Sequence, residues 1–258
     1  MIFKAISSLR CGNLMRATME GLVMINVIRD ASLDGDARKM GFVDVRYPAQ
    51  SEWDIEGFEA FKAKTLDEIR AEGAEYDRET VFRQHPYFRY YRKFKKSYPV
   101  MMQVESFLLK GRPFPEGEYI NAVAFLTELK THILLGTHDA DCIEGPVVLY
   151  SESEKTPFTG MINPDSHSYP GDLTGRDDKG IIISMIAGAD NRTCIHEDTD
   201  HVVYLIFSLP DIAEATGCGT GDSSDEAAQK AAISAVADEI ITAAKTLAPT
   251  AEIEFAIF

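Results

Sequence analysis

The chain has 258 residues, of which 45% are apolar, and a formal net charge of −15. This length and apolar content suffice for one large domain or two small ones with a hydrophobic core. The acidity argues against a generic nucleic-acid binder, which neutralises phosphates with a basic surface, and against attraction to anionic membranes.

The first part of the chain predicts short mixed elements followed by a helix. Residues 22–28 form an apolar run typical of a buried strand, and residues 42–47 alternate between apolar and polar side chains. Apolar side chains recur at helical spacing over residues 56–73, with Ser51 or Asp54 as the N-cap.

An aromatic and basic segment follows this helix. Tyr87, Tyr90, Tyr91 and Phe94 fall at i, i+3, i+4 and i+7, which predicts one face of a helix that ends before Pro99. A core face with a solvated basic flank accounts for this pattern. An RNA contact is the alternative, because the basic flank opposes the acidic average of the chain. The candidate RNA-binding residues are Arg89, Arg92, Lys93, Lys95 and Lys96.

The middle of the chain predicts two further helices, a polar turn and a strand. One helix covers residues 99–110, and a second, apolar helix begins at Tyr119. This second helix leads into Gly136–Asp141, where a His and two carboxylates fall within four positions. We expect this segment to be a turn, followed by a buried strand at residues 147–150.

The remaining chain predicts short strands and one long helix. Many Gly and Pro residues between 151 and 179 are typical of short strands joined by turns. Apolar or alternating runs predict strands at 181–186, 202–207 and 251–258. A loop at 220–224 precedes an Ala-rich helix that ends near Leu247.

Helices grouped in the middle and strands grouped later favour an α+β fold. We expect an N-terminal α/β portion at residues 1–85 to pack on a core at residues 86–258, in one compact domain. The four cysteines, Cys11, Cys142, Cys194 and Cys218, have no CxxC spacing, which predicts isolated reduced thiols and no metal. No secretory h-region or run of about 20 apolar residues is present, so we expect a cytoplasmic protein without membrane contact.

Short motifs between Tyr87 and Phe207 follow one another in a characteristic order. They are Tyr-Arg-Lys-Phe, a Tyr-Pro-initiated helix ending Phe-Leu-Leu-Lys-Gly, Ile-Asn-Ala-Val, Gly-Thr-His-Asp-Ala-Asp, Gly-Pro-Val-Val-Leu, Tyr-Pro-Gly-Asp and an expected hairpin over residues 191–199. This order resembles the B3/B4 domain of the phenylalanyl-tRNA synthetase beta subunit. It is closer still to the free-standing proteins that contain little else.

The resemblance implies mixed β-sheets packed against helices, and a function on tRNA. In the synthetase this domain hydrolyses tyrosine wrongly attached to tRNA(Phe), without a cofactor, and the family is labelled tRNA-binding. The family's editing pocket uses an Asn, matched by Asn121, and a turn whose Asp is matched by Asp139. Gly136 stands at the position of the family's His, and His138 lies two residues further on. Residues 190–192 stand where the family has a Glu.

The polar segment Gly136–Asp141 allows three interpretations. A carboxylate beside His138 would orient the imidazole and raise its pKa, which suits activation of a water for ester hydrolysis. The same groups could bind a metal if two ligands came from elsewhere. Alternatively, Asp139 or Asp141 caps the turn and His138 lies at the surface.

Arg192 and Thr193 form a second candidate set. A guanidinium suits a phosphate or carboxylate ligand, and an ion pair within an acidic protein is the alternative. His196, Glu197 and Asp198 precede a predicted strand, so we expect them in a solvated turn.

The leading hypothesis is a B3/B4-like protein that binds tRNA or an aminoacyl-tRNA end and hydrolyses mischarged esters. His138 and Asp139 are its candidate catalytic residues. The candidate substrate-binding residues are Asn121, Thr137, Asp141, Asp190, Arg192 and Thr193. The alternative is a non-catalytic binder of a small amino acid-like molecule or a protein partner. The net charge favours the alternative, and the basic helix favours RNA.

Overall fold

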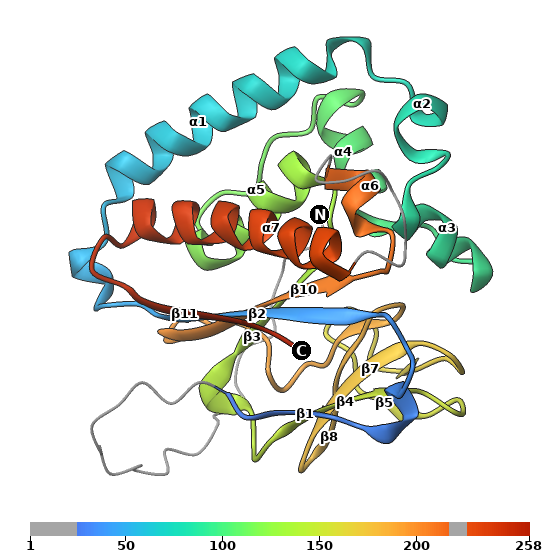
Figure 1. Cartoon of the computed structure of the whole chain (residues 1–258). Coiled ribbons are helices and arrows are strands. Elements are labelled where there is room, and N and C mark those ends of the chain that lie inside the picture. The colour runs from blue at the N-terminus through green and yellow to red at the C-terminus, as the bar shows by residue number, and fades with distance from the viewer. Residues whose placement is uncertain (1–24, 217–225) are drawn as a thin grey trace.

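A computed structural model describes residues 25–216 and 226–258 as an α+β protein (Figure 1). The strands are β1 (Val27–Arg29), β2 (Lys39–Arg46), β3 (Leu135–Asp139), β4 (Val147–Ser151), β5 (Pro157–Phe158), β6 (Ser166–His167), β7 (Leu173–Asp177), β8 (Gly180–Ser184), β9 (Gly188–Ala189), β10 (His201–Ser208) and β11 (Glu252–Ile257). The α-helices are α1 (Ile55–Glu72), α2 (Arg78–Phe82), α3 (Pro86–Lys93), α4 (Pro99–Leu108), α5 (Tyr119–Thr131), α6 (Ile212–Thr216) and α7 (Glu226–Leu247).

The strands form two main sheets and a small hairpin. An antiparallel four-stranded sheet has the order β11-β2-β10-β3. A mixed five-stranded sheet has the order β1-β4-β7-β8-β9, in which β1 runs parallel to β4 and the other pairs are antiparallel. Strands β5 and β6 pair with each other. Mixed and antiparallel sheets packed with helices thus confirm the α+β class.

The four-stranded sheet lies between two layers. Helices α5 and α7 cover one face, and the five-stranded sheet lies on the other side (Figure 1). A Cβ on Gly41 would lie 2.7 Å from Cγ2 of Ile233, so α7 approaches β2 closely enough to require glycine there. Every residue of β10 is buried, because layers cover both of its faces.

The connection from α5 into β3 positions the candidate site. Helix α5 ends at His132, which adopts a left-handed conformation with φ 58°. The buried carboxylate of Glu128 accepts a hydrogen bond from the backbone N–H of Leu135 at 2.9 Å. Burial raises the pKa of Glu128 to about 7. The Tyr98 hydroxyl donates to the carbonyl of His132 at 2.7 Å, which fixes the turn from the other side.

Helix α3 joins the two main sheets through tyrosine hydroxyls. Tyr87 donates to the carbonyl of Phe207 in β10, and Tyr91 donates to the carbonyl of Met185 beside β8. All its tyrosines are buried, so the interpretation of the aromatic stripe as a core face is confirmed. The helix ends at Lys93, before Pro99 as expected, and Lys95 then adopts a left-handed conformation with φ 57°.

Other sequence expectations are confirmed in part. Asp54 caps α1 through the N–H of Gly57 at 2.8 Å. The expected strand at residues 22–28 lies partly outside the described residues. The expected loop at 220–224 lies entirely outside them. Strand β2 comes from the predicted N-terminal portion and pairs with β10 and β11 from the core portion.

The expected hairpin over residues 191–199 is wrong. Strands β9 and β10, which flank this segment, belong to different sheets. The chain therefore crosses from one layer to the other between β9 and β10.

None of the helices within residues 25–216 and 226–258 combines the length and apolar character needed to cross a bilayer.

Two methionines provide a matched test of this packing. Met40 in β2 is fully buried, whereas the Met102 side chain on α4 is 53% exposed. We expect Met40→Ala to lower the free energy of unfolding by about 2–5 kcal/mol, because it removes buried methylenes and leaves a cavity. We expect Met102→Ala to change it by less than about 0.5 kcal/mol. Chemical denaturation of both variants measures the difference, and equal losses would contradict the layer arrangement.

Candidate functional site

The segment Gly136–Asp141 is a strand and a helical turn, so the expectation of a loop-like turn is wrong. Strand β3 pairs with β10 from Leu135↔Ile206 to Val202↔Asp139. Residues Ala140–Cys142 then form a short 3₁₀ helix, η4, which Asp139 caps through the N–H of Asp141 at 2.9 Å. Gly, Thr, His and Asp are common in turns, which is why their pattern concealed a strand.

Neighbouring residues of β3 face different layers. Successive side chains of a strand point to opposite faces of the sheet, so His138 lies on the same face as Gly136 and Asp139 lies on the other. A Cβ on Gly136 would lie 3.5 Å from Ile183 of β8, so this first face is directed at the five-stranded sheet. The predicted catalytic residues His138 and Asp139 therefore have separate environments and separate partners.

His138 belongs to a buried chain of hydrogen bonds. Its Nδ1 lies 2.7 Å from Oγ1 of Thr193, whose hydroxyl donates to the carboxylate of Asp190. Since this hydroxyl proton goes to Asp190, Nδ1 of His138 carries the proton that Thr193 accepts. His138 is 0% exposed, which overturns the expectation of a surface residue.

Burial, and then the charge of Arg192, lowers the pKa of His138 to about 4. The imidazole is therefore neutral at pH 7. Its Nε2 has no hydrogen-bond partner among the residues that the structure describes. The relay orients the ring but places it inside the protein, away from bulk solvent.

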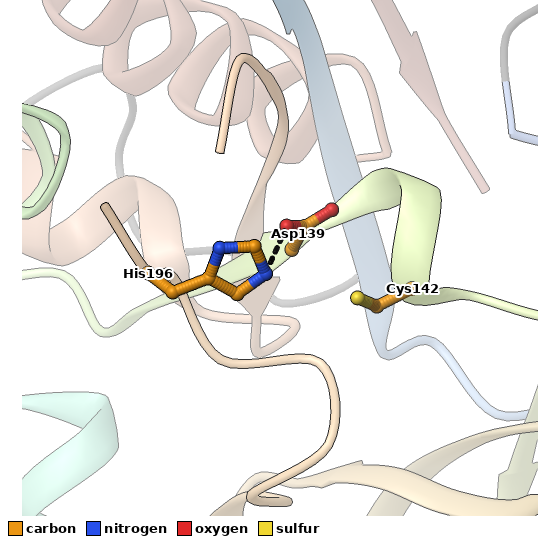
Figure 2. A group of neighbouring side chains, drawn as sticks. All are labelled: Asp139, Cys142 and His196. Carbon is orange, nitrogen blue, oxygen red and sulfur yellow. Dashed lines mark ion pairs between the residues drawn. The ribbon is translucent and has the colours of Figure 1, made fainter. Parts of the chain in front are cut away.

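Asp139 forms its own cluster near the surface. Its Oδ2 accepts a hydrogen bond from Oγ1 of Thr199 at 2.7 Å and lies 3.0 Å from Nε2 of His196. Asp139 is buried, whereas 48% of the His196 side chain is exposed. Figure 2 shows His196 directed at the carboxylate of Asp139, with Cys142 on the other side of this carboxylate and its sulfur directed back toward the pair. The carboxylate expected to orient His138 instead orients His196.

A third cluster centres on His201, which the sequence analysis did not single out. Its Nε2 lies 2.8 Å from Oδ1 of Asp44, and its Nδ1 lies 2.8 Å from Oδ1 of Asp141. Burial alone would lower the pKa of His201, but the hydrogen bonds to Asp141 and Asp44 outweigh it and raise the pKa to about 9. Asp44 within a strand of apolar neighbours was the signal that could have indicated a buried polar partner.

Arg192 is held by groups of the protein itself. Its guanidinium donates to the carboxylate of Asp177 at 2.8 Å and to the carbonyl of Cys142 at 2.5 Å, and it lies 3.7 Å from Asp190. The ion-pair alternative for Arg192 is thus confirmed. Asp190 itself is buried, and burial raises its pKa.

Asn121 and Thr137 lie on the helix side of the four-stranded sheet. Thr137 pairs with Tyr204, whose hydroxyl donates to the carbonyl of Ile120 at 3.1 Å. The amide of Asn121 donates to Glu118 at 2.8 Å. These two candidates are therefore separated by the sheet from His138, which faces the other layer.

A surface pocket of about 430 Å³ lies beside the Asp139 cluster. It is lined by residues 48–50, which follow β2, and by residues 197–200, which precede β10. Thr199, whose hydroxyl binds Asp139, belongs to this lining. Three exposed carboxylates, Glu197, Asp198 and Asp200, give the pocket a negative charge.

The five basic residues of the α3 segment lie elsewhere. All of them are exposed, and Arg89 forms an ion pair with Asp211. Figure 1 places α3 at the right and the connection from β2 to α1, which supplies residues 48–50 of the pocket, at the left. The cations therefore form a surface of their own, separate from the pocket.

A comparison of the chain with models of protein families and with curated proteins found no match. The assignment of chemistry to this site therefore depends on its geometry and on the resemblance in motif order.

The pKa of His201 predicts a pH-dependent stability. A histidine whose pKa is raised on folding stabilises the protein fully below its unfolded pKa of 6.5 and loses that contribution as pH rises through about 9. We expect the loss to be on the order of 3 kcal/mol between these limits, since one pKa unit corresponds to about 1.4 kcal/mol. Denaturant unfolding from pH 6 to 10 would measure it.

The matched variants for this experiment are His201→Gln and His167→Gln. We expect the first to lose this slope and the second, on the hairpin strand β6, to keep it. An identical slope in the wild type and in His201→Gln would show that His201 is not protonated between its two carboxylates.

Proposed function

We propose that this chain is a B3/B4-like protein that binds the amino group of an amino acid or of an aminoacyl ester in the pocket beside Asp139. The observation that carries the proposal is the charge of the pocket. Three exposed acidic residues belong to its lining, and its other wall, residues 48–50, bears no cation. A positively charged ammonium group is attracted there, and a phosphate is repelled.

The backbone around the pocket is fixed before any ligand arrives. The side-chain amide of Gln50 donates to the carbonyl of Glu197 at 2.9 Å, which joins the two walls. The Thr199 N–H donates to the carbonyl of His196 at 3.1 Å, and its hydroxyl reaches Asp139. A site held in this way loses little conformational entropy when a ligand binds.

Ligands that differ in one charge test this proposal. We expect tyrosine and tyrosine methyl ester, which share the ammonium group, to shift NMR signals of residues 197–200. We expect N-acetyltyrosine, which lacks that charge, not to bind. If all three compounds bind equally, or if none of them binds, recognition of an ammonium group is contradicted.

Charge-neutralising variants locate the binding site. We expect Asp198→Asn and Asp200→Asn each to weaken binding of tyrosine methyl ester by up to about fivefold, because an exposed ion pair contributes at most about 1 kcal/mol. Asp238→Asn, an exposed position on α7, is the matched control and should have no effect. Titration followed by NMR gives the dissociation constants.

A second candidate function, hydrolysis of mischarged tRNA, is favoured by the environment of His196, whereas the separation of the basic α3 surface from the pocket counts against it. His196 is exposed and its Nε2 lies 3.0 Å from the buried carboxylate of Asp139, an arrangement that suits a general base for attack of water on an ester. The basic surface of α3 supplies cations for a tRNA backbone. In this function the ester would lie at the pocket, and the tRNA body would contact α3.

Deacylation of tyrosyl-tRNA(Phe) tests this second function. We expect His196→Ala to reduce hydrolysis by about 10²-fold or more, as for loss of a general base, and His167→Ala to leave it unchanged. Replacement of Arg92 and Lys93 by Ala should weaken tRNA binding and reduce its salt dependence. Absence of both hydrolysis and tRNA binding at low salt would exclude this function and leave ligand binding as the proposal.

A further inference from the structure

Three side chains of different chemistry converge at the end of β3. They are Asp139 at the end of the strand, Cys142 at the end of η4, and His196 in the segment that leads to β10 (Figure 2). One carboxylate oxygen, one sulfur and one ring nitrogen all lie within 4.8 Å of one another. We propose that these three side chains bind a Zn²⁺ ion.

The ligand chemistry selects zinc over the common hard cations. Zn²⁺ binds thiolate sulfur, imidazole nitrogen and carboxylate oxygen, whereas Ca²⁺ and Mg²⁺ are bound by oxygen atoms. Tetrahedral bonds of about 2.0–2.3 Å place ligand atoms about 3.3–3.8 Å apart. The nitrogen of His196 and the oxygen of Asp139 are 3.0 Å apart, so these two atoms must separate slightly, and all three ligand atoms already lie within 4.8 Å of one another.

The surrounding hydrogen bonds orient two of the ligands in advance. The Asp139 carboxylate accepts one hydrogen bond from the Asp141 N–H at 2.9 Å and one from the Thr199 hydroxyl at 2.7 Å. The backbone N–H of His196 donates to that same hydroxyl at 3.1 Å. Partners of this kind fix ligand orientation and increase metal affinity.

Backbone contacts of the third ligand act in the same way. The guanidinium of Arg192 donates to the carbonyl of Cys142 at 2.5 Å, which fixes the backbone at the end of η4. Together with the bonds to Asp139, this contact holds ligands from separate segments in one place.

Charge and access also suit a cation. Asp139 is buried and acidic, and the neighbouring pocket carries further carboxylates that attract positive ions. His196 is half-exposed, so an ion can reach the cluster by rotation of one imidazole. Three protein ligands leave a fourth tetrahedral position for water or a ligand, as in catalytic zinc sites.

This site differs from the metal site that the sequence allowed. His138 and Asp141 have other partners: His138 faces the second sheet, and Asp141 binds His201. The test of zinc binding does not depend on the proposed function, because zinc binding is measured without substrate. Within the second candidate function the two uses of His196 exclude each other, since a lone pair bound to zinc cannot accept a proton.

Titration with Zn²⁺ and Co²⁺ tests the proposal. Protein freed of metal with a chelator is titrated with Zn²⁺ by calorimetry, and with Co²⁺ while its absorption is recorded. We expect one equivalent to bind and Co²⁺ to give a thiolate-to-metal charge-transfer band. We expect Cys142→Ser to abolish that band. It should also weaken Zn²⁺ binding by about 10–100-fold or more, because loss of a residue that only orients a metal ligand already weakens metal binding by that factor.

Two controls complete the experiment. Cys194→Ser is the cysteine control, because the Cys194 thiol donates to the carbonyl of Asn191 and is not one of the three proposed ligands. This variant should keep the charge-transfer band. His196→Ala alters a half-exposed side chain, so it tests the site even if Cys142→Ser fails to fold, and it should weaken Zn²⁺ binding to a similar extent. Absence of binding to the wild type, or equal binding to the wild type and His196→Ala, would overturn the proposal.

Discussion

Burial of β10 on both faces is the constraint on which the rest of the structure depends. Helices cover one face of the four-stranded sheet and the second sheet covers the other, so every residue of β10 is buried (Figure 1). A polar group beside such a strand loses its water and must find a partner within the protein. The hydrogen-bonded clusters around His138 and His201 are the result.

These two histidines show how neighbouring groups determine charge within one layer. Both are buried between the sheets. His138 has a hydroxyl partner, and burial keeps it neutral with a pKa of about 4. His201 has a carboxylate at each ring nitrogen, which raises its pKa to about 9. The same residue type is therefore an orienting neutral ring in one place and a buried cation in the other.

The surface of the protein separates opposite charges. The pocket at residues 197–200 is acidic, and the exposed side of α3 is basic. An ammonium group and a phosphate backbone would be attracted to different sides of the molecule. The proposed hydrolysis of mischarged tRNA would use both surfaces, whereas the proposed binding of a free amino acid would need only the pocket.

The sequence by itself determined the elements with strong local periodicity. The spacing of apolar side chains predicted α1 with Asp54 as its cap, and continuous apolar runs predicted β8 and β10. The aromatic spacing of α3 predicted its buried face. Each of these patterns gives the spacing of the side chains that face the core, and this spacing can be read from the local sequence alone.

Only the tertiary structure decided the candidate site. Strand β3 has the composition of a turn, and its pairing with β10 makes it a strand. The alternation of β3 then separates His138 from Asp139, which adjoin in sequence. The partners Asp44 and His201 are 157 residues apart, and Asp139 meets Thr199 across 60 residues. Such pairs are set by strand register and by the crossing between sheets, and no local periodicity encodes either.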